Sequence, residues 1–182
     1  AQGSHVVING MGDAAEIESI RQDLAKKYNV KVVYHPADMT QPDTIADMMQ
    51  MTQNTFGRLD VLVNNAGIQH VAAVDEFPVE KWNAIIAINL SSAFHTIRLG
   101  LPMMKQQGWG RIVNIGSIHT LVASPFKSAY NAAKHGIAGL TKTVALEVAQ
   151  QNITVNAICP AYVRTPLVEK QIADQARTRG IS

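Results

Sequence analysis

Short apolar runs alternate with longer segments of helical periodicity along the chain. The apolar runs are rich in β-branched residues and predict five strands, over residues 5–9, 30–34, 59–64, 111–116 and 153–158. The longer segments repeat apolar residues every three or four positions and predict helices over residues 13–28, 42–56, 78–105 and 125–150. Asp13 is the expected N-cap of the first helix, and each of the other three helices has a proline near its first turn.

The order of these elements predicts the fold class. Residues 61–63 and 112–115 are apolar at nearly every position, which is typical of a sheet that is covered on both faces. Alternation of strands and helices favours a parallel sheet. We therefore expect one Rossmann-like, doubly wound α/β domain over residues 1–182, with ligands beyond the carboxyl ends of its strands.

Composition narrows the class of partner. The chain has 16 Lys and Arg against 14 Asp and Glu, and the basic residues are scattered, so no basic patch favours nucleic acid. Polar side chains interrupt the most apolar stretch, residues 82–97, and we expect no membrane span. Cys159 is the only cysteine, which excludes an internal disulfide and a cysteine metal cluster; we expect it to be a small buried hydrophobic residue. A small-molecule ligand and a cytoplasmic location fit this composition best.

Two of the predicted strands end in residues that could bind a ligand or take part in catalysis. The third strand runs into residues 64–67, Asn-Asn-Ala-Gly, where the glycine lets the backbone approach a ligand. The fourth ends at Ser117 and is followed by a helix that carries Tyr130 and Lys134. Residues four apart lie above one another on a helix, so this tyrosine and lysine share a face.

A nearby ammonium group would lower the pKa of the tyrosine and so allow it to act as an acid or base. A phenol has an unperturbed pKa of about 10, and lowering it to about 7 requires about 4 kcal/mol. Two unit charges about 4 Å apart interact by about 4 kcal/mol at an effective dielectric constant of about 20. The interaction energy with the Lys134 ammonium is therefore large enough to make Tyr130 a general acid or base. An oxidised nicotinamide would add a second positive charge.

These residues together resemble the ordered motif set of the short-chain dehydrogenase/reductase family. The resemblance rests on residues 64–67, Asn89, Ser117, the Tyr130 and Lys134 pair, and residues 159–165, and it covers nearly the whole chain. It implies that Ser117 orients the reacting oxygen and that Tyr130 is the acid or base. It also implies that Lys134 holds the cofactor ribose and lowers the Tyr130 pKa, while Asn89 maintains a water-linked proton path.

Each of these residues also has a plainer interpretation. Ser117 would then be a polar strand terminus, Lys134 a solvated helix lysine, and Asn89 a helix residue that bonds a nearby backbone group. The joint occurrence of the motifs favours the catalytic interpretation. The resemblance further implies that residues from several strand ends and the motif helix contact the cofactor: Asp38, Asn65, Ala66, Gly67, Tyr130, Lys134, Pro160, Val163 and Thr165.

Residues 10–15 match a Gly-x-Gly-x-x-Ala dinucleotide fingerprint, because they follow a predicted strand and open a helix. Two observations argue against this assignment. The acidic residue expected about 20 positions later is missing, since Asp38 lies 28 positions after Gly10. The family's glycine-rich turn also has a wider spacing and follows the preceding strand. We therefore place residues 10–12 after the family's second strand, and expect the true glycine-rich turn upstream and a further segment downstream of this sequence.

The resemblance also bears on the cofactor. A 2'-phosphate requires a cation near the end of the first predicted strand, and residues 9–13 offer none, which favours NAD over NADP. Asn9 and Gly10 stand where many NAD-using relatives have an aspartate. Asp38 resembles the family's aspartate at the adenine amino group, and Ala161 replaces a more usual glycine after Pro160.

Polar residues around the predicted catalytic group point to the substrate. The helix macrodipole opposes a cation in the first turn by about 0.3 to 1 kcal/mol, so Lys127 favours an anionic substrate; the alternative is a lysine with its ammonium group in water. The surrounding residues resemble the D-3-hydroxybutyrate dehydrogenase branch of the family, in which Tyr162 is commonly Trp. That resemblance implies substrate contacts at Gln69, Ser117, His119, Lys127, Tyr130 and Gln171.

The leading hypothesis is NAD-dependent oxidation of a short 3-hydroxy acid, D-3-hydroxybutyrate to acetoacetate, by a protein that is a homotetramer when complete. A second hypothesis within this class is a reductase of ring ketones or acyl-carrier substrates. From another class, the chain would be a non-catalytic nucleotide-binding module of the same fold. The intact set of Ser117, Tyr130 and Lys134 weighs against that module.

Overall fold

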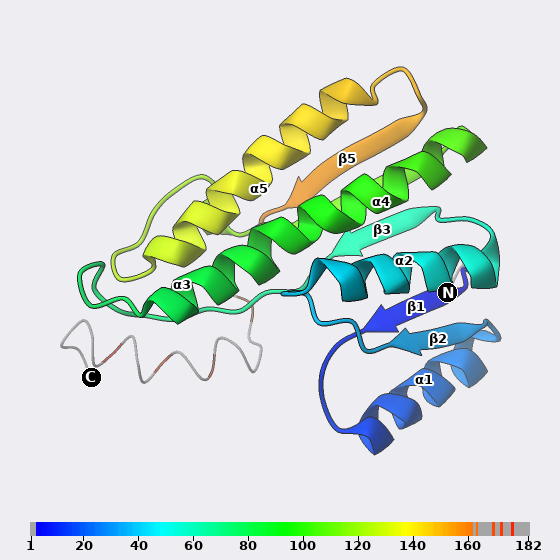
Figure 1. Cartoon of the computed structure of the whole chain (residues 1–182), viewed down its shortest axis with the longest axis horizontal. Helices are drawn as coiled ribbons and strands as arrows, with labels where there is room; N and C mark the ends of the chain where they lie inside the picture. Colours follow the sequence, from blue (N-terminus) through cyan, green and yellow to red (C-terminus); the bar gives the residue numbers. More distant parts are fainter. Residues whose placement is uncertain (1–2, 162, 164–168, 170–171, 173–175, 177–182) are drawn as a thin grey trace.

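The computed structural model describes residues 3–161 and, beyond them, residues 163, 169, 172 and 176. Strands and helices alternate along the described chain (Figure 1). The elements are β1 Val6–Asn9, α1 Ala14–Tyr28, β2 Val32–His35, α2 Pro42–Phe56, β3 Val61–Asn64, α3 Val79–Ile86, η1 Ala87–Ser91, α4 Ser92–Gln107, β4 Gly110–Ile115, η2 Ile118–Thr120, α5 Ser128–Glu147 and β5 Ile153–Ile158.

All ladders between these strands are parallel, which confirms the expected α/β class. β1 pairs with β2, with Val6 opposite Val32, and β4 pairs with both β3 and β5. The described strands thus form a two-stranded and a three-stranded sheet, with no ladder between β1 and β3. In Figure 1 the arrows of the two sheets point the same way, and α2 is drawn between β3 and β1. Their carboxyl ends therefore lie along a common edge.

The main core lies between the three-stranded sheet and the helices α4 and α5. It contains Leu62 of β3, Ile112 of β4 and Val155 of β5, packed against Ile97 and Met104 of α4. A second cluster, around Ile45 and Met49 of α2, joins α2 to α4 and to Val7 of β1. In Figure 1, α2, α4 and α5 lie in front of the strands. These helices fix the position of the strand ends that carry the candidate site.

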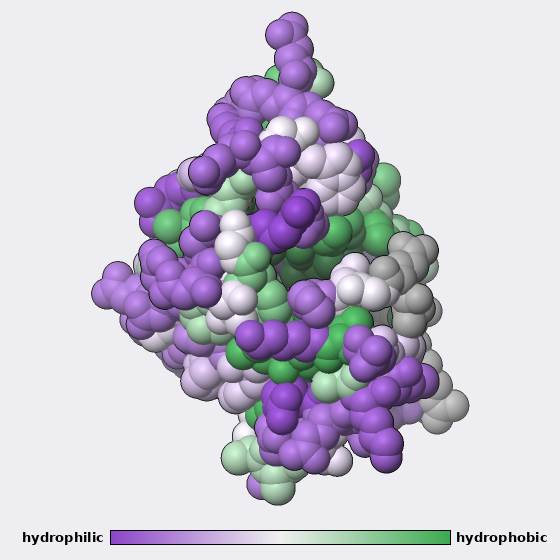
Figure 2. All heavy atoms as spheres, turned by 90° about the vertical axis from the view of Figure 1, so that its right-hand side faces the viewer, coloured by the Kyte–Doolittle hydropathy of each residue, from purple (hydrophilic) through white to green (hydrophobic). Residues whose placement is uncertain are grey.

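The opposite face of β3 is open within the described part of the chain. Val61 and Val63 are 50% and 54% exposed, whereas Leu62 between them is buried. α1 contacts β2 but has no buried residue of its own, and Ile20 at its centre is 47% exposed. Seen from the right-hand side of Figure 1, hydrophobic side chains gather in a hollowed region at the middle of the surface (Figure 2). The described residues therefore cover only part of the sheet.

α3, η1 and α4 form one continuous helical segment, Val79–Gln107, with a π-helical turn over Ala87–Ser91. The expected helix over residues 78–105 is confirmed, but the π turn was not predicted. An 18-residue window of the segment has a mean hydropathy of 1.3, so the segment is long and apolar enough for a membrane span by length and composition alone. It packs against α2, α5 and β3, however, as the core helix of a globular domain does.

Local chemistry explains where the observed boundaries differ from the predicted ones. The Asp13 carboxylate accepts hydrogen bonds from the backbone amides of Ala15 and Glu16, which confirms it as the N-cap of α1. The last helix begins at Ser128, so the predicted start of this helix at Pro125 was wrong by three residues. Phe126 adopts a left-handed conformation, with φ at 64°, and this interrupts any helix between Pro125 and Ser128.

Candidate active site

Ser117 lies immediately beyond β4, in a tight capping turn. Its hydroxyl oxygen accepts a hydrogen bond from the His119 amide at 3.2 Å, and its own amide donates to Thr120 Oγ1 at 2.9 Å. Gly116 makes this turn possible, because a Cβ at that position would lie 2.7 Å from Thr120 Oγ1 and 3.0 Å from Cys159 Sγ. The turn holds the Ser117 hydroxyl in a buried position at the edge of the sheet.

Tyr130 and Lys134 lie on the first turns of α5 and face this strand end. The Lys134 ammonium is almost fully buried; it donates to the carbonyl of Ile115 at 2.6 Å and lies 5.6 Å from the centre of the Tyr130 ring. The predicted shared face is therefore confirmed, and Lys134 is not a solvated lysine. Ile115 is two residues before Ser117, so this one hydrogen bond joins α5 to the strand end that carries Ser117.

Burial dominates the electrostatics of the pair. Burial raises the pKa of Tyr130, and the hydrogen bond with Ser117 lowers it only in part. Burial also lowers the pKa of Lys134 to about 8. Here the lysine nitrogen is directed at the Ile115 carbonyl and desolvation dominates at the phenol, so a lowered Tyr130 pKa in the presence of Lys134 and an oxidised nicotinamide stays a prediction.

Asn89 lies in the π-helical turn and is buried. Its side chain accepts from the amide of Ile68 and donates to the carbonyl of the same residue, both at 2.9 Å. The two hydrogen bonds pin the loop that follows β3, which agrees with the plainer interpretation of this asparagine. π turns are frequent at functional sites, since they redirect backbone groups out of the helix.

A buried polar network, which the sequence analysis did not identify, joins the strand ends beneath the site. Thr96 donates to Asn64 Oδ1 at 2.6 Å, Asn64 donates to Asn114 Oδ1 at 2.8 Å, and Asn114 donates to Thr141 Oγ1 at 2.9 Å. The network runs from α4 through β3 and β4 to α5. It fixes β3 and α5 relative to one another, and its only sequence signal is an asparagine at an otherwise apolar strand position.

The residues after β3 remain open to a ligand. Asn65, Ala66 and Gly67 are exposed at the carboxyl edge of the sheet. A Cβ at Gly67 would meet its nearest neighbour, Asn89 Oδ1, at 3.8 Å, so the glycine leaves space there without being required by close packing. This strand end and the end of β4 are adjacent, because Asn64 and Asn114 are paired in the sheet.

Lys127 occupies the N-cap position of α5 and is 3% exposed. The interpretation of this residue as a snorkelling lysine with its ammonium in water is therefore wrong. Because Lys127 precedes the first helical residue, it also does not lie in the first turn as expected. The left-handed Phe126 before it is held by a 3.0 Å hydrogen bond from the Ala72 amide to the Phe126 carbonyl.

His119 packs against Tyr130, with ring centres 5.9 Å apart in an edge-to-face arrangement. Its Nδ1 lies 3.2 Å from Ser117 Oγ, and its Nε2 lies 2.6 Å from Ser124 Oγ. The structure thus brings His119 to the catalytic group. Gln69 also lies on the loop after β3, and its amide nitrogen is buried without a hydrogen-bond partner among the described residues.

The candidate nucleotide-binding residues lie along the same strand edge. Asp38 follows β2, and its carboxylate accepts hydrogen bonds from the amide and hydroxyl of Thr40, which lower the pKa of this carboxyl group. Pro160 follows β5, and its carbonyl accepts from the Ile118 amide at 2.8 Å. Val163 is exposed. Tyr162, Thr165 and Gln171 lie outside the described residues.

Cys159 corrects a further expectation, because it is exposed rather than buried. It follows the last residue of β5 at the open edge of the sheet. Its sulfur lies close to Gly116, because a Cβ added at that glycine would be 3.0 Å from it.

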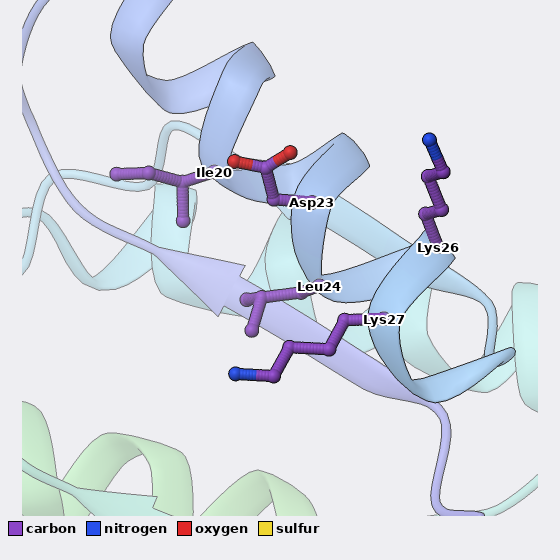
Figure 3. A pocket seen from close by; sticks show the side chains of 5 residues that line it. All are labelled: Ile20, Asp23, Leu24, Lys26 and Lys27. Carbon is purple, nitrogen blue, oxygen red and sulfur yellow. The ribbon is translucent and has the colours of Figure 1, made fainter.

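A separate hollow on the surface contains none of the candidate site residues. α1 alone lines it, and Figure 3 shows Ile20, Asp23, Leu24, Lys26 and Lys27 around it.

The family model described as short chain dehydrogenase matches residues 1–176 of the chain. The chain belongs to the short chain dehydrogenase family. A protein named D-beta-hydroxybutyrate dehydrogenase from Rhizobium meliloti is 63% identical over 180 residues, which cover 99% of this chain and 70% of that protein. Another of the same name, from Cupriavidus necator, is 57% identical over 182 residues, covering 100% of this chain and 69% of that protein.

Solved structures support the same fold. The crystal structure of an NAD+-bound xylitol dehydrogenase matches with a TM-score of 0.88 and 30% identity; the match covers 95% of this chain and 66% of that one. The chain thus spans about two thirds of these short chain dehydrogenases. Membership in this family of oxidoreductases makes the cluster of Ser117, Tyr130 and Lys134 the candidate active site.

Proposed function

We propose that the protein oxidises D-3-hydroxybutyrate to acetoacetate with NAD. The observation that carries the proposal is the cluster of Ser117, Tyr130 and Lys134 at the end of β4, with the buried cation Lys127 three residues from the tyrosine. The 63% and 57% identities to proteins named D-beta-hydroxybutyrate dehydrogenase support the same substrate.

The chemical step removes a proton from the C3 hydroxyl and a hydride from C3 itself. Tyr130 takes the proton of the C3 hydroxyl, while Ser117 holds the oxygen that becomes the carbonyl. Bound NAD supplies the hydride acceptor and a positive charge. Because burial raises the Tyr130 pKa, that second charge and the Lys134 ammonium are together needed to stabilise the phenolate. Asn89 holds Ile68 through its side chain, which does not exclude the role we propose for it in a water-linked path that returns the proton to solvent.

The exposed strand ends fit a dinucleotide. The backbone of Asn65, Ala66 and Gly67 is exposed beside β4. Lys134 lies next to Tyr130, with its ammonium 5.6 Å from the centre of the tyrosine ring. We propose cofactor contacts at these residues and at Asp38, Pro160, Val163 and Thr165. NAD is preferred over NADP because residues 9–13 contain neither lysine nor arginine.

The substrate carboxylate is held by Lys127 and His119, with amide hydrogen bonds from Gln69 and Gln171. Lys127 is 3% exposed at the start of α5, where a charge-assisted hydrogen bond to the carboxylate of a 3-hydroxy acid on this side of Tyr130 would be shielded from water. A homotetramer in the cytoplasm is the proposed form of the full-length protein.

Replacement of Lys127 tests the carboxylate anchor. Charge-assisted hydrogen bonds contribute about 1.5 to 3 kcal/mol, so Lys127→Ala is expected to lower kcat/KM for D-3-hydroxybutyrate at least about 10-fold. The loss should be much smaller for an uncharged secondary alcohol of similar size. Lys142→Ala is the matched control, because Lys142 is an exposed lysine on the same helix.

Equal losses on the charged and the neutral substrate would assign Lys127 to stability or to tuning of Tyr130. A full-length enzyme that is active on other alcohols or on acyl-carrier ketones, but not on short 3-hydroxy acids, would refute the substrate assignment and leave the Tyr130 chemistry standing.

A further inference from the structure

The side chain of Asn9 joins the carboxyl ends of β1 and β2. Its amide nitrogen, Nδ2, donates hydrogen bonds to the backbone carbonyls of His35 and Ala37, both at 2.9 Å. Carbonyl oxygens only accept, so the nitrogen of the carboxamide must face both of them, and the two hydrogens of Nδ2 are used. The two contacts therefore fix the orientation of this side chain. Asn9 is not among the proposed cofactor contacts.

The backbone ladder between β1 and β2 stops just before the segment that Asn9 holds. The pairing ends at Asn9, which lies opposite His35. Pro36 follows, and a proline has no amide hydrogen with which to continue the ladder. Asn9 Nδ2 reaches past this proline to the carbonyl of Ala37. The chain beyond β2 thus stays attached to the end of β1.

Other contacts hold the two segments that this amide joins. On the β1 side, the Tyr34 hydroxyl donates to the carbonyl of Gly10, directly after Asn9, at 2.9 Å. On the β2 side, Ala37 is 2% exposed and packs in the second core cluster, against α2. These contacts determine where each segment lies. The Asn9 amide determines how the peptide after Ala37 is turned.

That peptide leads directly into Asp38, a proposed contact of the cofactor. The Ala37 carbonyl and the Asp38 nitrogen belong to one planar peptide, so a hydrogen bond to the carbonyl restricts the orientation of the backbone from which Asp38 extends. The Asp38 carboxylate is held in turn by Thr40, whose amide and hydroxyl both donate to Oδ1 at 2.8 Å. Asp38 Oδ2 takes part in neither hydrogen bond and can accept from a ligand.

We propose that Asn9 is a positioning residue for the adenosine end of the cofactor: its amide turns the peptide between Ala37 and Asp38 so that Asp38 Oδ2 accepts from the adenine amino group. The proposal rests on the proposed use of NAD and adds a residue to that site. An ionised aspartate at position 9 would not serve, because a carboxylate has no hydrogen to donate to either carbonyl.

Calorimetry of NAD binding to the full-length protein is the first test. Asn9→Leu and Asn9→Asp keep a side chain of similar size and have no donor for the two carbonyls at neutral pH. A neutral hydrogen bond corresponds to a change of about 2- to 12-fold, so both variants should raise the Kd for NAD by about 3- to 10-fold. Repulsion between a carboxylate and the phosphates of NAD would instead weaken binding in Asn9→Asp alone.

Asn152→Asp is the matched control. Asn152 also donates from Nδ2 to a distant backbone carbonyl, that of Gly108 at 3.2 Å, but it precedes β5 and so lies at the amino ends of the strands. Its replacement should leave the Kd for NAD within about twofold of the wild type. An unchanged or lower Kd in either Asn9 variant would overturn the proposal, as would an equal rise in the control.

A double-mutant cycle tests whether Asn9 acts through Asp38. Asp38→Ala removes the carboxylate, and its loss of NAD affinity should be at least as large as that of Asn9→Leu. In the Asp38→Ala background, Asn9→Leu should raise the Kd for NAD by less than about twofold, because no carboxylate remains to be positioned. A further loss as large as in the wild-type background would refute the positioning role.

Binding of AMP and steady-state kinetics locate the effect within the cofactor. AMP carries only the adenosine end, so Asn9→Leu should raise its Kd by the same factor as that of NAD. In kinetics the KM for NAD should rise while kcat at saturating NAD stays within about twofold of the wild type, because the affected contact is remote from Tyr130. An unchanged affinity for AMP, or a lowered kcat, would contradict the proposal. Because the binding measurements need no hydroxy acid, their outcome is distinct from failure to oxidise 3-hydroxybutyrate.

Discussion

Lys134 is expected to lower the free energy of unfolding of the protein, although the proposed catalysis requires this lysine. Burial lowers the pKa of its ammonium from 10.5 to about 8. The difference corresponds to about 3 kcal/mol, at about 1.36 kcal/mol per pH unit. Near pH 7 the folded and unfolded chains both carry the protonated lysine, so the folded state bears this full cost of desolvation.

The pH dependence follows from the sign of that change. Between pH 8 and pH 10.5 the unfolded chain binds more protons than the folded chain, so the contribution of Lys134 to stability rises with pH. Above pH 10.5 the lysine is neutral in both states and the cost disappears. Lys134→Met removes the cost at every pH, but it leaves the Ile115 carbonyl without its donor, which costs about 1 kcal/mol.

Lys134→Met is therefore expected to be inactive yet about 1 to 2 kcal/mol more stable than the wild type at neutral pH. Urea unfolding followed by circular dichroism, at neutral pH and again above the unfolded pKa of lysine, measures both differences. The advantage of the variant should vanish or reverse at the higher pH. Lys142→Met, which changes an exposed lysine of the same helix, should show no such dependence. A Lys134→Met protein that is less stable at neutral pH, or a difference that is the same at both pH values, would refute the reasoning.

Two further substitutions test the turns at the edge of the sheet. Gly116→Ala should destabilise the protein by about 1 to 3 kcal/mol, measured as a lowered Tm, because the added Cβ meets Thr120 Oγ1 at 2.7 Å. Gly12→Ala should leave NAD affinity of the full-length protein within about twofold by calorimetry, because the added Cβ contacts only Ile17 Cδ1, at 3.8 Å. A large loss of NAD affinity in the second variant would mean that residues 10–15 are the dinucleotide fingerprint after all.

Periodicity predicted the elements whose boundaries depend on local chemistry. The strand Ile153–Ile158 and the helix Pro42–Phe56 begin and end where the sequence predicted them. Proline at the first turn and glycine after the last turn mark the ends of that helix, and α1 begins after its capping aspartate for the same kind of reason. The shared face of Tyr130 and Lys134 follows from helix geometry alone.

Features that depend on contacts distant in sequence were not predictable. The left-handed Phe126 is held by Ala72, more than fifty positions earlier, and this contact delays the start of α5. The exposure of Cys159 depends on which groups lie beyond the end of β5. The pKa of Tyr130 depends on burial and on the direction of the Lys134 nitrogen, which spacing along the helix does not determine. The partners of the His119 ring were hidden for the same reason.

Turnover of D-3-hydroxybutyrate by the full-length protein and its Tyr130→Phe variant tests the central claim most directly. With NAD in excess, the wild type should produce acetoacetate and reduced cofactor in equal amounts. Tyr130→Phe should lose at least about 100-fold in turnover while its NAD affinity is retained, because the phenolic proton route disappears and the cofactor contacts do not. A Tyr130→Phe enzyme with wild-type turnover would contradict the account.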